Sequence, residues 1–258
     1  MSEIVFYDIP GKTEDTKAWS PSTWRTRYSL NFKGIPYRTE WVEYPEIEKV
    51  CKEIGAEPTD KSPDGKPLYT FPVIHDPSTN TILSDSTPIA EYLDKTYPDS
   101  PKLFPPGTKG FHAAFDSAFY SILARTPSLW NLVALGACTN LTPRSEAFFR
   151  DTFWRRRCDE TTPIEELAGS EGSERKEQNW REVEADWVKI GTWYEASGGL
   201  FLTGGETPCY ADIVLAAWLV WARQSWGKGS EDWKRLERLD GGRWGRFMKA
   251  FEKYEAVV

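Results

Sequence analysis

The sequence predicts two domains, a small α/β domain over residues 1–98 and an all-helical domain over residues 111–258. Three observations support this division. In the first domain the sequence pattern predicts a strand, a loop, a helix and a second strand, in that order. A stretch rich in Pro and Gly then follows at residues 99–110, and beyond it apolar residues recur at helical spacing. We therefore expect a linker at 99–110 between an α/β domain and a helical bundle.

The first predicted helix organises the α/β domain. Residues 4–7 form a short apolar strand, and residues 35–42 alternate as a half-buried strand does. Between them, Ser20 is a good N-cap residue, Pro21 suits the first helical position, and Gly34 ends the helix. The helix begins beyond the end of the first strand, where free N–H groups and the helix dipole attract anions. We therefore expect ligand chemistry beside the Ser20 hydroxyl.

The remainder of this domain reads as one short helix, a hairpin and a last helix. Residues 44–54 are amphipathic and open with a proline, while residues 55–66 have the composition of an exposed loop. Residues 68–76 form an apolar strand with a proline inside it, and residues 81–83 resume as its hairpin partner. The segment 84–88 then begins a helix.

The second domain shows helical periodicity almost throughout. Phe111, Phe115 and Phe119 recur every four residues, which is typical of one long helix face. The strand signal at 200–202 is the exception, and residues 163–172 read as an acidic loop. Further helices are expected over 143–158, 173–196, 211–226, 233–239 and 244–255.

Composition and charge exclude several classes of function. A net charge of −7 and a pI near 5.1 argue against nucleic-acid binding. Apolar runs fall short of membrane-spanning length, and the first three residues lack the basic start of a signal peptide. We therefore expect a cytoplasmic protein that contacts neither nucleic acid nor membrane.

Cysteine and histidine usage gives no sign of a metal site. Cys51, Cys138, Cys158 and Cys209 are scattered without ligand spacing, so free thiols are expected. Two histidines argue against a Ser-His-Asp triad and against a His-rich centre. Tryptophan is abundant instead, with 13 copies. Most are expected in the core, although a few could line a pocket for a flat aromatic ligand.

Four local features resemble the glutathione transferase family. Residues 20–25, Ser-Pro-Ser-Thr-Trp-Arg, are similar to the S-x-x-x-W-R stretch of its zeta-like and etherase-like branches. Residues 71–74 resemble the stretch around the family's cis-proline, and 85–93 resemble its acidic-Ser pair with the following helix. Residues 211–213 resemble the helix-capping motif, although Cys209 stands where the family has Ser or Thr. The chain looks most like fungal members related to bacterial β-aryl etherases.

The resemblance implies a thioredoxin-like N-terminal domain, a helical-bundle C-terminal domain and glutathione as co-substrate. In this family a serine activates the glutathione thiol, which implies that role for Ser20. Ser22 is the rival donor, and Trp19 could shield the thiol from water. A helix N-terminus and one donated hydrogen bond can together bring a thiol pKa of about 8.5 towards neutrality.

The remaining glutathione contacts are expected at two places in the α/β domain. Phe71 is expected to pair its backbone with the cysteinyl unit, within the stretch that includes Pro72 and Val73, and we predict a cis bond before Pro72. Asp85 would take the γ-glutamyl ammonium and Ser86 the carboxylate. The glycyl carboxylate needs a cation, for which the sequence offers Lys49, Lys52, Lys61 and the candidate carried forward, Lys66.

The resemblance therefore implies an enzyme, a glutathione transferase that acts in detoxification. The expected reaction is glutathione conjugation, or glutathione-dependent ether cleavage, of hydrophobic aromatic compounds by a homodimer. Trp19, Phe111, Phe115 and Phe119 are expected to form the second-substrate site at the domain junction. A carrier of aromatic molecules with weak turnover and a ligand-free interaction module are the alternatives. Arg25 and Arg27 are expected in core or interface ion pairs.

Overall fold

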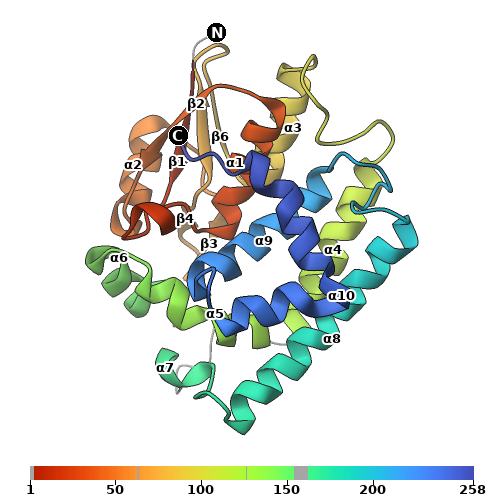
Figure 1. Cartoon of the computed structure of the whole chain (residues 1–258). Coiled ribbons are helices and arrows are strands. Elements are labelled where there is room, and N and C mark those ends of the chain that lie inside the picture. Colours follow the sequence, from red (N-terminus) through yellow and green to blue (C-terminus); the bar gives the residue numbers. More distant parts are fainter. Residues whose placement is uncertain (1–2, 63, 126, 154–161) are drawn as a thin grey trace.

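The computed structural model describes residues 3–62, 64–125, 127–153 and 162–258. Figure 1 shows a small sheet domain, which carries both ends of the chain, and beside it a larger helical domain. The predicted fold class is confirmed: a mixed α/β sheet domain precedes a helical one. None of the described helices is long and apolar enough to cross a membrane.

The main sheet has four strands in the order β2-β1-β5-β6. β1 (Ile4–Asp8) runs parallel to β2 (Tyr37–Trp41), while β5 (Val73–Asp76) is antiparallel to β1 and to β6 (Thr81–Ser84). A right-handed crossover suits such a parallel pair, and the helix that crosses between β1 and β2 is α1.

Three helices accompany the sheet. α1 (Pro21–Lys33) and α3 (Ser86–Thr96) pack against each other on the side of the helical domain, and α2 (Ile47–Ile54) lies on the opposite side (Figure 1). α1 ends as the sequence predicts, because Gly34 adopts the left-handed conformation, with φ of 66°, and its N–H caps the helix.

The strand expected over residues 68–76 is interrupted. A short β4 (Pro67–Leu68) pairs with β3 (Asp60–Lys61), inside the segment expected as a loop, and the main-sheet strand begins only at Val73. Proline has no N–H to donate, so Pro72 cannot continue the ladder. The peptide bond before it is cis, which confirms that prediction.

The helical domain is built around α9 (Tyr210–Trp226), which is buried on nearly all sides as its apolar sequence predicts. The other described helices of this domain are α4 (Lys109–Arg125), α5 (Ser128–Thr139), α6 (Pro143–Phe148), α7 (Ile164–Leu167), α8 (Glu174–Ser197) and α10 (Glu231–Phe251). Of these, α4, α5 and α10 pack against α9. Residues 239–242 leave helical geometry within α10, close to the break expected between two terminal helices.

Four expectations for this domain need correction. α5 was not predicted, although its composition is strongly apolar. The helix expected over 143–158 continues past α6 only as a π-helical turn at Phe149–Phe153, and its remainder, with Cys158, lies outside the described residues. The segment 163–172 contains the short α7. Residues 200–202 form a turn rather than a strand; the Asp212 carboxylate, 3.0 Å away, accepts the N–H of Leu202.

The start of α9 resolves the effect of the cysteine in the capping motif. The Asp212 carboxylate accepts the backbone N–H of Cys209 at 2.9 Å, and the Cys209 thiol takes the place of the usual hydroxyl. Both halves of the capping box are therefore present despite the weaker acceptor.

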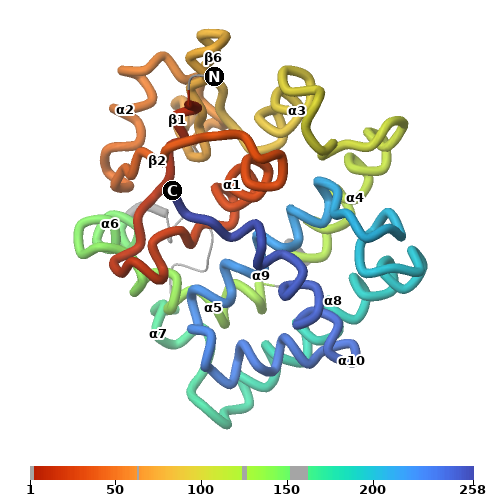
Figure 2. Tube along the Cα trace, turned by 45° about the horizontal axis from the view of Figure 1, so that its top comes forward, coloured from red at the N-terminus to blue at the C-terminus, as the bar shows by residue number. Residues whose placement is uncertain are grey.

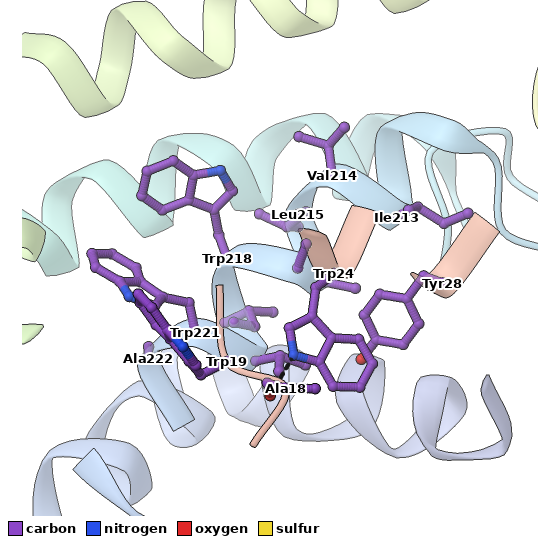
Figure 3. Packing of buried hydrophobic residues seen from close by; sticks show 14 of the residues in the cluster. Ala18, Trp19, Trp24, Tyr28, Ile213, Val214, Leu215, Trp218, Trp221 and Ala222 are labelled. Carbon is purple, nitrogen blue, oxygen red and sulfur yellow. Dashed lines mark hydrogen bonds between the residues drawn. The ribbon is translucent and has the colours of Figure 1, made fainter. Parts of the chain in front are cut away.

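Aromatic packing joins the two domains. Figure 3 shows Trp24 and Tyr28 of α1 beside Ile213 and Leu215 of α9, and all four are buried. The chain end also returns to the sheet domain (Figure 2), where Asn31 donates to the carbonyl of residue 254 at 2.7 Å. The position of α1 is thus set by both domains.

Candidate active site

The strand register brings three separate segments to the same end of the sheet, the end at which β1 finishes. Val73, the first residue of β5, lies opposite Tyr7 near the end of β1 and opposite Ser84 at the end of β6. The residues just before Val73 and just after Ser84 therefore lie at the carboxyl end of β1. α1 returns antiparallel to β1 and so begins at this same end.

Ser20 occupies the N-cap position of α1, as predicted. Its backbone is extended, with φ of −66° and ψ of 130°, and its side chain makes no capping hydrogen bond to the helix. Because the hydroxyl is not used as a cap, it can donate to an anion at the helix mouth. Ser22 lies two residues further on, exposed on the first turn.

Phe71 presents its backbone rather than its side chain. The ring is buried, with its centroid 6.0 Å from that of Tyr7. Its backbone N–H and carbonyl form no hydrogen bond with any other described residue. The next carbonyl, that of Pro72, accepts the N–H of Asp85 at 3.2 Å. This bond ties the Phe71-Pro72-Val73 stretch directly to the start of α3.

Asp85 and Ser86 form the N-terminal end of α3. Asp85 is exposed and has a positive φ of 74°, a conformation that costs energy for a residue with a Cβ. Such outliers concentrate where a ligand is held. Ser86 is buried, and Arg25 of α1 donates to its Oγ at 3.5 Å.

The two arginines of the Trp-Arg stretch have different environments. Arg27 pairs with Asp8 at 2.8 Å inside the sheet domain, which confirms its expected role in a core ion pair. Arg25 lies beside Ser86 instead, and its guanidinium is 5.2 Å from the ring centroid of Tyr120 in α4. Burial raises the pKa of the Asp116 carboxyl, and the nearby Arg25 opposes that rise.

The candidate lysines are all on the surface. Lys66 is 79% exposed and pairs with Asp64 at 2.8 Å, while Lys52 pairs with Glu48 at 2.6 Å. Lys49 lies 3.8 Å from Glu53. Exposed ion pairs are weak, and long side chains reorient at little cost, so these pairs do not prevent any of the lysines from binding a ligand. The choice of Lys66 stays a prediction.

The predicted second-substrate residues are spread over three environments. Trp19 is buried beside Ser20, and its indole N–H has no partner within the described part of the chain. Phe115 and Phe119 stack with ring centroids 5.6 Å apart, and Phe119 has no exposed surface. Phe111 is 39% exposed on the surface of α4.

Phe115 also lines a cavity of about 90 Å³ between α3, α4 and α9. Thr87 and Glu91 of α3 face this cavity, as do His112 of α4 and Tyr210 of α9. It therefore lies at the junction of the two domains, where ligand sites are common.

Sequence reasoning missed a second aromatic group near α1. Tyr120 of α4 is 38% exposed and lies 6.3 Å from Trp218 of α9, whose ring is 6.0 Å from that of Trp130 in α5. The abundance of tryptophan signalled such a group. Which tryptophans meet could not be read from the sequence, because they come from different helices.

A mixed α/β sheet domain with a cis-proline, followed by a helical domain, is the fold of the glutathione transferases. Models of the glutathione S-transferase N-terminal and C-terminal domains match residues 19–96 and 110–254. The chain belongs to the glutathione S-transferase family.

Individual relatives agree with this assignment. A glutathione S-transferase of Ceriporiopsis subvermispora, solved in complex with glutathione, is 47% identical with a TM-score of 0.92, and the match covers 100% of this chain and 99% of that one. Glutathione transferase GSTFuA3 from Phanerochaete chrysosporium is 44% identical with a TM-score of 0.90 and the same coverage. The glutathione S-transferase-like protein ustS of Aspergillus flavus is 30% identical over 92% of this chain and 84% of its own length.

Proposed function

We propose that this glutathione transferase activates the glutathione thiol with Ser20 and directs it at hydrophobic aromatic compounds. The observation that carries the proposal is the Ser20 hydroxyl, which stands at the N-terminus of α1 without capping it. The described thiols of the protein are poor nucleophiles, because burial raises the pKa of Cys51 and of Cys138 to about 11 and also raises that of Cys209. The nucleophile in this proposal is the thiol of the bound glutathione.

Two interactions lower the pKa of that thiol. The first N–H groups of α1 favour the anion, and the Ser20 hydroxyl donates a hydrogen bond to the sulfur. A hydrogen bond to a charged group contributes about 1.5–3 kcal/mol, and each unit of pKa corresponds to about 1.4 kcal/mol. Together they would bring the thiol from about 8.5 to near neutrality, where thiolate fraction and nucleophilicity are balanced.

Glutathione would lie at the carboxyl end of β1, between the start of α1 and the start of α3. The Phe71 backbone, which has no internal partner among the described residues, would pair with the cysteinyl unit as a strand does. Asp85 would bind the γ-glutamyl ammonium, and Ser86, at the N-terminus of α3, the carboxylate. Lys66 would take the glycyl carboxylate. A relative that is 47% identical was solved in complex with glutathione, which supports glutathione as the ligand.

The second substrate would meet the sulfur between α1 and α4. Phe115 of α4 lines the cavity at the domain junction, and Phe111 and Phe119 belong to the same helix. Trp19 directly precedes Ser20, and Tyr120 of α4, found only from the structure, lies beside Arg25 of α1. In conjugation, the thiolate forms a C–S bond and the leaving group departs with its electron pair. In ether cleavage, the same attack on the ether carbon expels an aryloxide, which then takes a proton.

A carrier of aromatic molecules is the second candidate function. The edge-to-face cluster of Tyr120, Trp130 and Trp218 favours it, because aromatic surfaces hold flat ligands without turnover. Turnover of a model electrophile and of an aryl ether separates the two functions. Slow or absent turnover, combined with saturable aromatic binding, would favour the carrier.

We also propose a cytoplasmic homodimer that acts in detoxification. The dimer rests on the family assignment, because glutathione S-transferases are typically dimeric. Light scattering of the purified protein measures the oligomeric state. A monomer at micromolar concentration would contradict the dimer and leave the chemistry untouched.

The decisive experiment titrates the thiolate absorbance of bound glutathione in Ser20→Ala and Ser22→Ala. Ser20→Ala should raise the thiol pKa by about one to two units, which corresponds to one charged hydrogen bond. Glutathione affinity should change little, since Phe71, Asp85 and Ser86 hold the peptide. A pKa shift confined to Ser22→Ala would transfer the role to Ser22.

A further inference from the structure

The loop between β1 and α1 closes on itself before the chain reaches Ser20. Pro10 and Ala18 form an antiparallel bridge at its base. The carbonyl of Ala18 accepts the indole N–H of Trp24 at 2.8 Å, and Ser20 follows two residues later. The end of this loop thus lies against α1 and leads directly into Ser20 at the start of the helix.

Asn140 of the helical domain holds both sides of the loop. Its Nδ2 donates to the carbonyl of Thr16 at 3.1 Å, and its Oδ1 accepts the Thr16 hydroxyl. Its backbone carbonyl accepts the N–H of Lys12 at 2.7 Å. The next residue, Leu141, forms an isolated bridge with Gly11. Asn140 is 7% exposed, so these bonds are made largely out of water.

The start of α6, which closely follows Asn140 in the sequence, holds a second segment beside Trp19, the one around Tyr44. Ser145, in the first turns of α6, accepts the N–H of Tyr44 through its Oγ at 3.0 Å. The Tyr44 ring lies 6.4 Å from that of Trp19. Trp19 directly precedes Ser20. The segment between α5 and α6 thus supports Ser20 in two ways, through the loop of residues 10–18 and through the packing of Tyr44 beside Trp19.

We propose that Asn140 is a positioning residue for Ser20. It acts through the loop of residues 10–18 and has no contact with glutathione in the arrangement above, so the proposal rests on the proposed role of Ser20. A serine hydroxyl stabilises a thiolate only within hydrogen-bond distance. Displacements of about 1 Å, produced far from the chemistry, can lower a rate by about a hundredfold.

Two graded variants test this. Asn140→Asp keeps the acceptor for the Thr16 hydroxyl but sets an oxygen against the Thr16 carbonyl in place of the Nδ2 donor. Thr16→Val removes the hydroxyl alone and keeps the carbonyl contact. The control is Asn131→Ala in α5, the helix that ends just before Asn140; the Asn131 amide donates to Asn179 within the helical domain, 3.1 Å away.

The expected readouts separate positioning from stability. Asn140→Asp should raise the pKa of the bound thiol by about one unit and lower kcat about tenfold, with less than about a twofold change in the KM for glutathione. Thr16→Val should shift the pKa in the same direction by less. Asn131→Ala should lower the melting temperature without moving the pKa.

A folded Asn140→Asp protein with an unchanged thiol pKa would overturn the proposal. If that variant does not fold, Thr16→Val decides, and an unchanged pKa there would equally overturn it. Ser20→Ala, measured in parallel, keeps the two proposals distinct. If Ser20→Ala shifts the pKa and the two loop variants do not, the positioning role fails and the role of Ser20 stands.

Discussion

The guanidinium of Arg27 donates to the carboxylate of Asp8 across 2.8 Å, and neither side chain has any exposed surface. Tyr37 and Thr39 of β2 accept from the same guanidinium, each at 3.2 Å. Arg27 therefore ties α1 to both parallel strands. Since α1 carries Ser20 at its N-terminus, this buried pair fixes the helix on which the proposed chemistry depends.

Removing one partner of this pair should destabilise the protein strongly. Asp8→Asn would leave the Arg27 charge buried without a counter-ion, which typically costs about 3–5 kcal/mol. Equilibrium unfolding in denaturant measures the loss. The double variant Asp8→Leu with Arg27→Met should lose less than either single change. A double variant less stable than both would contradict this account.

Stability should fall at acid pH because of His112. Burial lowers the pKa of this imidazole from 6.5 to about 4, and the residue is 6% exposed. Between these values the unfolded chain binds a proton that the folded protein excludes. The contribution of His112 is therefore constant above pH 6.5 and becomes unfavourable by up to about 3 kcal/mol as the pH falls towards 4.

His112→Phe isolates that contribution from other titrating groups. The free energy of unfolding of this variant should depend less on pH between 4 and 6.5 than that of the parent protein. Both ring nitrogens of His112 lack a partner among the described residues, so the change removes no described hydrogen bond. Parallel pH profiles for the two proteins would show that folding does not lower the pKa of His112.

Replacing Asp85 with glycine should raise the stability of the protein and lower its affinity for glutathione. Asp85→Gly relieves the positive φ of 74° and should stabilise the protein by about 1 kcal/mol. It also removes the carboxylate proposed for the ammonium, so the dissociation constant for glutathione should rise about tenfold. Asp85→Asn, which tolerates the same backbone, should weaken binding with little change in stability. Titration calorimetry measures the dissociation constant for glutathione. Unchanged values in both variants would show that Asp85 does not bind glutathione.

Gly11→Ala should reproduce the effect of Asn140→Asp from the other side of the contact. A Cβ at residue 11 would lie 2.3 Å from the carbonyl oxygen of Thr16 and 2.8 Å from Nδ2 of Asn140. Backbone would have to move, and the loop before Ser20 would move with it. Gly110→Ala, where a Cβ meets nothing within 4 Å, is the matched control. Equal thiol pKa values in the two variants would count against the coupling.

Local sequence signals determined most of the α/β domain. Pro21 and Gly34 mark the limits of α1 because their backbone preferences act within a few residues. The apolar run of α9 likewise predicts a buried helix, since that environment follows from composition. Ser20, Asp85 and Ser86 could be proposed as site residues from the sequence because each lies at the start of a helix, and the signals for a helix start are local.

Only the tertiary structure decided which distant residues meet. Asn140 reaches Thr16 and Arg25 reaches Ser86 across long separations in sequence, and no periodicity encodes such pairs. The strand signal at 200–202 failed for the same reason, because a strand needs a partner and this one lies in a helical domain. Backbone propensity acts between neighbours, whereas packing and hydrogen bonding between domains depend on how whole elements are placed.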